Sequence, residues 1–343
     1  MGRRITGPRA STAFTTIDID KPGKQNGFVM IPHSPHDDAW GVTRIPIGII
    51  SNGKGPTVIL EGGNHGDEYE GPIAIAELMR DLPADQVEGR LILMPSVNVP
   101  AAVAGQRTST VDGLNFNRTF PGDPRGTMTQ QISAFMSDEI LPRGDAFIDL
   151  HSGGSSLDIL PSSVVEPADD AELERKSIAA NRAFDAPAIV VISNLGDTRT
   201  ATASAIASGL ITVGTEMGGC GTVSIEALEI CRRGVRNVLS HLGVLPGHTI
   251  EIRHENQKVL ELPGSKAFVY ATMDGVFEGF HQKGREVRAG EEAGRIHCPW
   301  DPTRPPETLT YQADGILYGR RQPGRVKPGN CCLVVAAPYQ EEI

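Results

Sequence analysis

Short apolar runs alternate with helically spaced apolar residues along residues 42–243 of the chain. The short runs, which are typical of buried strands, lie at 45–50, 57–60, 91–94, 146–150 and 211–213. Apolar residues recur at helical spacing over 75–82, 132–140, 168–184, 198–208 and 224–242. Strands that alternate with helices in this way predict an α/β fold in which helices cover a largely buried sheet.

At about Leu245 the pattern of alternating strands and helices ends. Beyond this point short alternating strands predominate. Two segments here, 274–279 and 314–319, resemble each other and start 40 residues apart. Repeated hairpins would produce this pattern, which faintly resembles biotinyl or lipoyl carrier domains but lacks a lysine at the expected hairpin tip. We therefore expect an N-terminal extension over 1–40, an α/β domain over 41–245 and a β-rich C-terminal cap over 246–343.

Composition narrows the class of protein. The chain has 343 residues with 39% hydrophobic and 22% charged residues, as in an ordinary globular protein. A formal charge of −10 argues against nucleic-acid binding, and no apolar run approaches the ~20 residues that cross a membrane. The five cysteines form no Cys-x-x-Cys pair, and we expect no export signal because no apolar segment follows Arg3-Arg4. These features favour reduced thiols and a cytoplasmic location.

Two polar stretches are expected to be loops. His33, His36, Asp37 and Asp38 lie close together, but no ligand spacing is present and a solvated loop is the simpler interpretation. Residues 98–125 form a connection too long for a simple turn, and long loops are usually functional or disordered.

The most informative stretch is the glycine-rich turn that follows the apolar run at 57–60. His65 and Glu68 lie on this turn, three residues apart, and can bind one metal ion if the backbone bends enough. Taken alone, the pair favours a polar loop in which Glu68 caps the next helix. A third candidate ligand, His151, directly follows the run at 146–150, and sites in α/β sheets gather at the carboxyl ends of strands. Two histidines and a glutamate leave a fourth position open, which is the pattern of catalytic zinc.

Two further acidic residues follow predicted strands. Asp149 lies two residues before His151, so both side chains share one face of a strand and Asp149 could orient the imidazole. Its alternative is a strand-end residue bonded to backbone amides. Glu216 follows the run at 211–213 and could act as a general base on water. Its alternative is an exposed glutamate in a turn.

These motifs resemble the succinylglutamate desuccinylase/aspartoacylase family. The resemblance lies in the turn at 62–68, in Asn117-Arg118, in 149–153 and in Glu216, and it extends over roughly residues 40–340. It implies a zinc-carboxypeptidase-like mixed sheet flanked by helices, with a smaller all-β C-terminal domain. The segments 24–28 and 36–41 are similar to a narrower branch that deacetylates Nα-acetyl-L-2,4-diaminobutyrate in ectoine degradation.

The resemblance also implies roles for single residues. His65, Glu68 and His151 would hold one Zn²⁺ per chain, and Glu216 would be the general base and then the acid. The family's mode of action implies hydrolysis of an amide bond, in which acetate leaves an α-amine.

Other residues would bind the substrate. The resemblance implies that Asn117 and Arg118 grip the α-carboxylate and that Arg107 polarises the scissile carbonyl. A surface arginine is an equal alternative for Arg107. From position alone, Asp158 is the candidate partner for a side-chain ammonium group, and Tyr311 is the best candidate for a tyrosine in the substrate pocket.

The expected function is zinc-dependent hydrolysis of Nα-acetyl-L-2,4-diaminobutyrate to L-2,4-diaminobutyrate and acetate. One alternative is an amidohydrolase of the acetylaspartate or succinylglutamate type, whose substrate would call for an extra pocket arginine. Another is a zinc-binding protein without catalysis. The expected partner is a small N-acyl amino acid, with no nucleic acid and no membrane, and a homodimer is left open.

Overall fold

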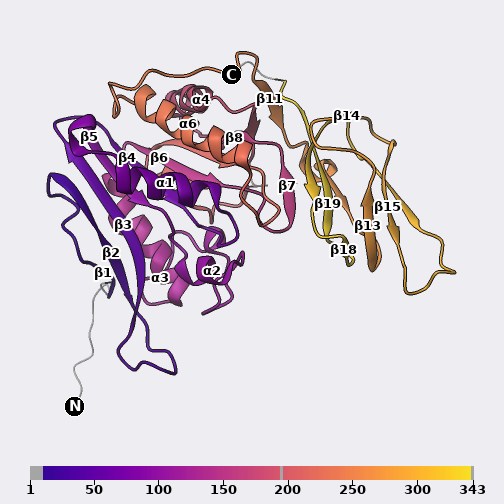
Figure 1. Cartoon of the computed structure of the whole chain (residues 1–343), viewed down its shortest axis with the longest axis horizontal. Coiled ribbons are helices and arrows are strands. Elements are labelled where there is room, and N and C mark those ends of the chain that lie inside the picture. Colours follow the sequence, from indigo (N-terminus) through magenta and orange to yellow (C-terminus); the bar gives the residue numbers. More distant parts are fainter. Residues whose placement is uncertain (1–10, 194–195, 341–343) are drawn as a thin grey trace.

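The computed structural model describes residues 11–193 and 196–340. Most of its strands belong to one mixed β-sheet. Helices cover both faces of this sheet, and β-strands without long helices make up the C-terminal part (Figure 1). The α/β fold class and the all-β C-terminal part that the sequence predicts are therefore confirmed. Within the described residues no helix is long and apolar enough to span a bilayer.

The main sheet follows the order β1-β2-β3-β5-β4-β6-β10-β8-β9-β11-β19-β17-β14, with β12 on β19 and β7 on β17. A second sheet follows the order β16-β15-β13-β18. The strands up to the site region are β1 (Phe14–Thr15), β2 (Gly23–Pro32), β3 (Val42–Asn52), β4 (Thr57–Gly62), β5 (Gly89–Met94), β6 (Ala146–His151), β7 (Leu157–Ile159), β8 (Ser162–Val165), β9 (Ala188–Val191) and β10 (Ile211–Glu216). The remaining strands are β11 (Lys258–Glu261), β12 (Phe268–Tyr270), β13 (Gly275–Gly279), β14 (Glu286–Val287), β15 (Glu292–His297), β16 (Glu307–Thr310), β17 (Gly315–Arg321), β18 (Arg325–Val326) and β19 (Cys331–Pro338).

The helices agree with the predicted segments, apart from one addition. They are α1 (Glu70–Asp81), α2 (Val99–Ala104), α3 (Met128–Phe135), α4 (Ala171–Phe184), α5 (Ala201–Ala207) and α6 (Ile225–His241). Short helical turns are η1 (Ala84–Gln86), η2 (Phe116–Arg118), η3 (Met136–Ile140), η4 (Leu141–Arg143) and η6 (Gly264–Ala267). The prediction of a loop over 98–125 was wrong in part, because α2 and η2 lie within it. Six residues between Asn98 and the left-handed Gly105 are too few to produce a recognisable helical period.

Successive residues of the central strands point into two different apolar cores. Val58 and Leu60 of β4 pack with α1, α4 and α6, whereas Ile59 packs on the other face with α3 and α5. On β6, Ile148 and Leu150 join the first core and Phe147 joins the second. Because side chains alternate along a strand, Asp149 and His151 share the face of Phe147. The polar ends of these strands are therefore held rigidly between two packed layers.

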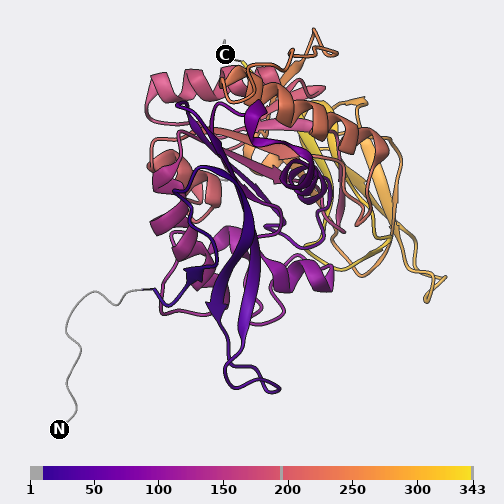
Figure 2. The same cartoon turned by 60° about the vertical axis from the view of Figure 1, so that its left-hand side comes forward.

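The segment predicted as an N-terminal extension contributes a strand to this sheet. β2 pairs along its whole length with β3, from Gly23 opposite Ser51 to Pro32 opposite Val42. The connection between these two strands projects away from the body of the molecule (Figure 2). His36, Asp37 and Asp38 are exposed on it, as expected of a solvated loop. The part of the predicted extension over residues 1–10 lies outside the described residues.

The two similar C-terminal segments become β13 and β17, but they are not separate hairpins. β13 pairs with β18, the short strand that follows the second segment, and β17 pairs with β14, the short strand that follows the first. Strand β19 then joins β17 to β11, which pairs in parallel with β9. Apolar side chains of β9, β17 and β19 form one cluster across this junction. The domain boundary at 245 stays a prediction.

Candidate active site

The turn between β4 and α1 has a shape that depends on two glycines. Gly63 has a positive φ of 66°, which side chains other than glycine rarely adopt. At Gly66 a Cβ atom would come within 2.0 Å of the backbone of Ala101 in α2, so only glycine fits. The turn therefore packs closely against α2 and presents His65 and Glu68 at the carboxyl end of β4.

Asp67 connects this turn to the one that follows β6. Its Oδ2 accepts hydrogen bonds from the backbone N–H and the hydroxyl of Ser155, each 2.8 Å long. Asp67 is almost fully buried whereas Ser155 is exposed, so these bonds are partly protected from water. They hold the segment after His151 against the segment that carries His65 and Glu68.

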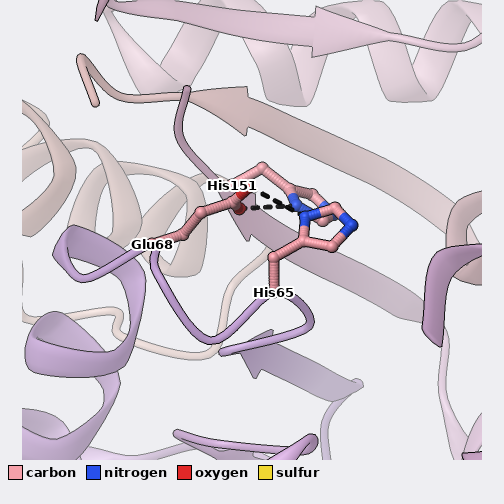
Figure 3. Close-up of side chains that lie close together, drawn as sticks. All are labelled: His65, Glu68 and His151. Atoms are coloured by element: carbon pink, nitrogen blue, oxygen red, sulfur yellow. Dashed lines mark hydrogen bonds and ion pairs between the residues drawn. The ribbon is translucent and has the colours of Figure 1, made fainter. Parts of the chain in front are cut away.

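Three side chains of these two turns meet around one point. His65 Nδ1 lies 2.8 Å from Glu68 Oε1, and His151 Nδ1 lies 2.9 Å from Glu68 Oε2 (Figure 3). Potential ligand atoms of the three residues all lie within 4.8 Å of one another. The structure thus brings together the three residues that the sequence predicts as metal ligands.

The other nitrogen of each imidazole also faces an oxygen. His65 Nε2 lies 3.2 Å from Asn115 Oδ1, and His151 Nε2 lies 3.0 Å from Asp149 Oδ1. A neutral imidazole has one N–H, so it can donate to only one of two oxygens. A cation between the Nδ1 atoms and Glu68 satisfies the remaining lone pairs, and this donor set therefore fits a metal ion.

The charges of the three residues are tightly linked. Burial lowers the pKa of His65, which favours the neutral imidazole that a metal requires. Burial also opposes charge on His151, but the carboxylates of Asp149 and Glu68 outweigh it and raise the His151 pKa well above its usual value. For Glu68, burial is likewise outweighed, because both imidazoles and their hydrogen bonds lower its pKa. The two imidazoles therefore favour the ionised form of Glu68, which a metal ligand requires.

Glu216 ends β10 directly beside His151, because the two residues pair across the parallel strands β10 and β6. Burial, and next the negative charge of Glu68, raise the pKa of Glu216 to about 8. Its Oε2 is buried and has no hydrogen-bond partner among the described residues. A carboxyl group in this state can accept or release a proton near neutral pH.

These groups line one cavity of about 130 Å³. All of the predicted catalytic and metal-binding residues border it, as do Asn117, Arg118 and Asp149. Arg107 reaches the cluster, with its Nη1 3.3 Å from His65 Nδ1 and 3.5 Å from Glu68 Oε1. About half of its side chain is exposed, so it lies at the open side of the site.

Comparison with known proteins identifies the family of this chain. Residues 54–242 match the model of the succinylglutamate desuccinylase/aspartoacylase catalytic domain. The chain is 38% identical over 331 residues, 96% of both chains, to Nα-acetyl-L-2,4-diaminobutyric acid deacetylase of Halomonas elongata. The chain belongs to the succinylglutamate desuccinylase/aspartoacylase family.

Solved structures of family members have the same fold. The product-bound ectoine utilization protein EutE of Ruegeria pomeroyi has a TM-score of 0.92 and 37% identity, over 96% of this chain and all of that one. A succinylglutamate desuccinylase/aspartoacylase from Rhodobacter sphaeroides has a TM-score of 0.90 and 41% identity over the same shares.

The pair Asn117-Arg118, which the family resemblance assigned to substrate binding, lies at the wall of the cavity. Asn117 Oδ1 accepts a hydrogen bond of 2.8 Å from the backbone of Ala201, and its Nδ2 lies 3.5 Å from His151 Nε2. Arg118 Nε lies 3.1 Å from a carboxylate oxygen of Asp197. Asn117 is therefore fixed, whereas the guanidinium of Arg118 remains partly exposed.

Two predicted substrate residues of this family member lie elsewhere. Asp158 does not border the cavity; its carboxylate pairs with the ammonium of Lys283 from the C-terminal part. Tyr311 is buried in the C-terminal core, where its hydroxyl lies 3.0 Å from His281 Nδ1. Both predictions rested on sequence position. Long-range packing, which sequence position does not show, determines where these two side chains lie. Tyr318 lies closer to Glu216: its hydroxyl is 2.7 Å from Ser162 Oγ, and burial, followed by the charge of Glu216, raises its pKa.

Several cavity residues were missed in the sequence. Thr202 donates a hydrogen bond of 3.0 Å to Asp149 Oδ2. Glu61 does not border the cavity, but it lies opposite Asp149 on β4, and burial followed by the charge of Asp149 raises its pKa well above its usual value. Glu166 and Thr200 also border the cavity. Glu61 and Glu166 stand at or just beyond a strand end, which is the signal that identified Glu216, but the strand at 162–165 was not predicted.

Proposed function

We propose that this protein is a zinc-dependent amidohydrolase that removes the acetyl group of Nα-acetyl-L-2,4-diaminobutyrate. The observation that carries the proposal is the position of Glu216, which borders the same cavity as His65, Glu68 and His151. The relative in Halomonas elongata, named for this deacetylation, covers 96% of the chain and supports the choice of substrate.

Zn²⁺ bound by His65, Glu68 and His151 would polarise the acyl oxygen and make a water molecule more acidic. Glu216 takes a proton from the attacking water and delivers it to the departing α-amine. Its pKa of about 8 allows both transfers near neutral pH. Arg107, at the open side of the cluster, donates to the negative charge that develops on the acyl oxygen.

The charges of the cavity wall favour an amino acid with one carboxylate. Arg118 offers a partly exposed guanidinium for the α-carboxylate, a task that suits its planar fork. Among the described residues that border the cavity, the arginines are Arg107 and Arg118. Acetylaspartate or succinylglutamate would require a further positive group for the second carboxylate, so we favour the diaminobutyrate substrate.

Substrate profiling of the zinc-loaded protein tests this proposal. We expect fastest hydrolysis of Nα-acetyl-L-2,4-diaminobutyrate and slower hydrolysis of acetylaspartate and succinylglutamate. Glu216→Gln should still bind one zinc ion per chain but lose turnover by about 10²- to 10⁴-fold. The same substitution at exposed Glu255, outside the cavity, is the matched control and should retain activity. A zinc-loaded protein that hydrolyses none of these compounds would instead support a binding protein.

A further inference from the structure

Glu166 stands immediately after β8, on the cavity side of the sheet. β8 runs antiparallel to β10, with Ser162 opposite Glu216 and Val164 opposite Gly214. Because side chains alternate along a strand, Glu166 shares the face of Val164. Val164, Glu166 and Glu216 all border the cavity. The Glu166 carboxylate therefore borders the same cavity as Glu216. It lies farther from the metal-binding cluster along the paired strands β8 and β10.

The other acidic residues of the described cavity lining already have roles near the reacting bond. Both oxygens of Glu68 face imidazole nitrogens. Asp149 contacts His151 and accepts a hydrogen bond from Thr202. Glu216 is the proposed base. Among the described residues, Glu166 is therefore the acid of the cavity to which neither metal binding nor proton transfer is assigned.

The end of the cavity near Glu166 also carries the positive charge of Arg118. A neighbouring cavity of about 500 Å³ is bordered by Arg118, Ile192 and Pro167, and the first cavity is bordered by Arg118, Ile192 and Glu166. Glu166 and Pro167 are adjacent in the chain, so an acid and an arginine line the same region. The amino-acid end of an acyl-diaminobutyrate has one negative and one positive group, and this region has a complementary charge for each.

We propose that Glu166 is the specificity-determining residue that binds the side-chain ammonium of the substrate, an inference that rests on the proposed function. Arg118 binds the α-carboxylate, Glu166 binds the ammonium, and the acyl carbonyl points to the metal-binding cluster. The assignment replaces Asp158, which borders neither cavity and pairs with Lys283.

The test compares a charged and a neutral substrate in matched variants. For Nα-acetyl-L-2,4-diaminobutyrate, Glu166→Gln should lower kcat/KM by about 10- to 150-fold, mainly through KM, because one charged hydrogen bond is lost. For Nα-acetyl-L-2-aminobutyrate, which lacks the ammonium, the same variant should lower kcat/KM much less, so that the ratio of the two kcat/KM values falls. Glu166→Asp keeps the charge and should retain part of the preference. Glu255→Gln is the control for an acid on the surface.

Product inhibition gives a readout that does not depend on turnover of the charged substrate. With the neutral substrate in the assay, L-2,4-diaminobutyrate should inhibit the wild-type enzyme more strongly than L-2-aminobutyrate, and Glu166→Gln should remove the difference. Melting temperatures identify a misfolded variant, in which case Glu166→Ala serves as the second removal of charge.

The outcomes separate this inference from the proposed function. If the wild-type enzyme prefers the diaminobutyrate substrate and both charge-removing variants keep the same preference, the role of Glu166 is wrong and the function stands. If the wild-type enzyme prefers acetylaspartate, succinylglutamate or the neutral substrate, both are overturned.

Discussion

Replacing Glu216 by glutamine should stabilise the metal-free protein, and increasingly so as the pH rises. In the folded protein the Glu216 carboxyl is held beside Glu68, and burial is the first cause of its raised pKa. Glutamine has nearly the same shape but never ionises, so the substitution removes the cost of a buried charge. Active sites are expected to retain residues that lower the stability of the fold when those residues are needed for the reaction.

The size of the effect follows from the two pKa values. The Glu216 pKa is about 8 in the folded protein, against the ordinary 4.5 of a glutamate, and each pKa unit is worth about 1.4 kcal/mol. For an acid whose pKa is raised by folding, the unfolded chain releases its proton first, so ionisation opposes folding above pH 4.5. The penalty is about 1 kcal/mol at pH 5.5, about 5 kcal/mol at pH 8.5, and constant above that.

Urea unfolding of the chelator-treated proteins at several pH values measures this. The free energy of unfolding of Glu216→Gln should exceed that of the wild type by an amount that grows by about 3 to 4 kcal/mol between pH 5.5 and 8.5. Glu255→Gln, which removes an exposed carboxylate, should show no such slope. A constant difference between Glu216→Gln and wild type over this range would show that Glu216 is already ionised in the fold, and the argument for its role as a base near neutral pH would fail.

Three further substitutions test the cluster around Glu216. His151→Ala should abolish stoichiometric zinc binding and the rise in melting temperature on zinc addition, both measured after chelation and reloading, because it removes one of three ligands. Asp149→Asn should keep the metal but weaken its affinity by about 10- to 100-fold in a competition titration with a chelating dye, since Asp149 faces the outer nitrogen of His151. Asp67→Ala should lower the free energy of unfolding by about 1–3 kcal/mol in urea, because the N–H and hydroxyl of Ser155 lose their buried acceptor.

The meeting of the candidate metal ligands could be predicted because each stands at the carboxyl end of a strand that the apolar pattern makes visible. β4 and β6 are neighbours in parallel, with Gly62 opposite Leu150, so the residues that follow them must meet at one edge of the sheet. Glu216 follows the same rule, because β10 pairs with β6 on its other side. Strand order was not visible in the sequence, but four polar residues at three strand ends limited the possibilities to one edge.

The substrate side of the cavity could not be predicted in the same way. Asp158 lies on β7, which pairs with β17 more than 150 residues later, and this pairing brings it to Lys283. The two repeated segments indicated a β-rich part, but their exchanged partners, β14 and β18, depend on long-range packing. Local periodicity carries no information about such pairings, because it records which face of an element is buried and not which element buries it.

The pKa values of Glu68 and Glu216 are shifted in opposite directions, and the surroundings of each carboxyl group explain the difference. Glu68 receives a hydrogen bond from the backbone N–H of Ser152 and faces two imidazoles, which favour its charged form and suit it to bind a metal. Glu216 has a buried oxygen without a hydrogen-bond partner among the described residues, and the charge of Glu68 further disfavours its ionisation. Two carboxyl groups whose pKa values are driven apart are a mark of divided roles in catalysis. The fold alone therefore distinguishes the proposed ligand from the proposed base, and an exchange of the two roles would require both hydrogen-bond environments to be rebuilt.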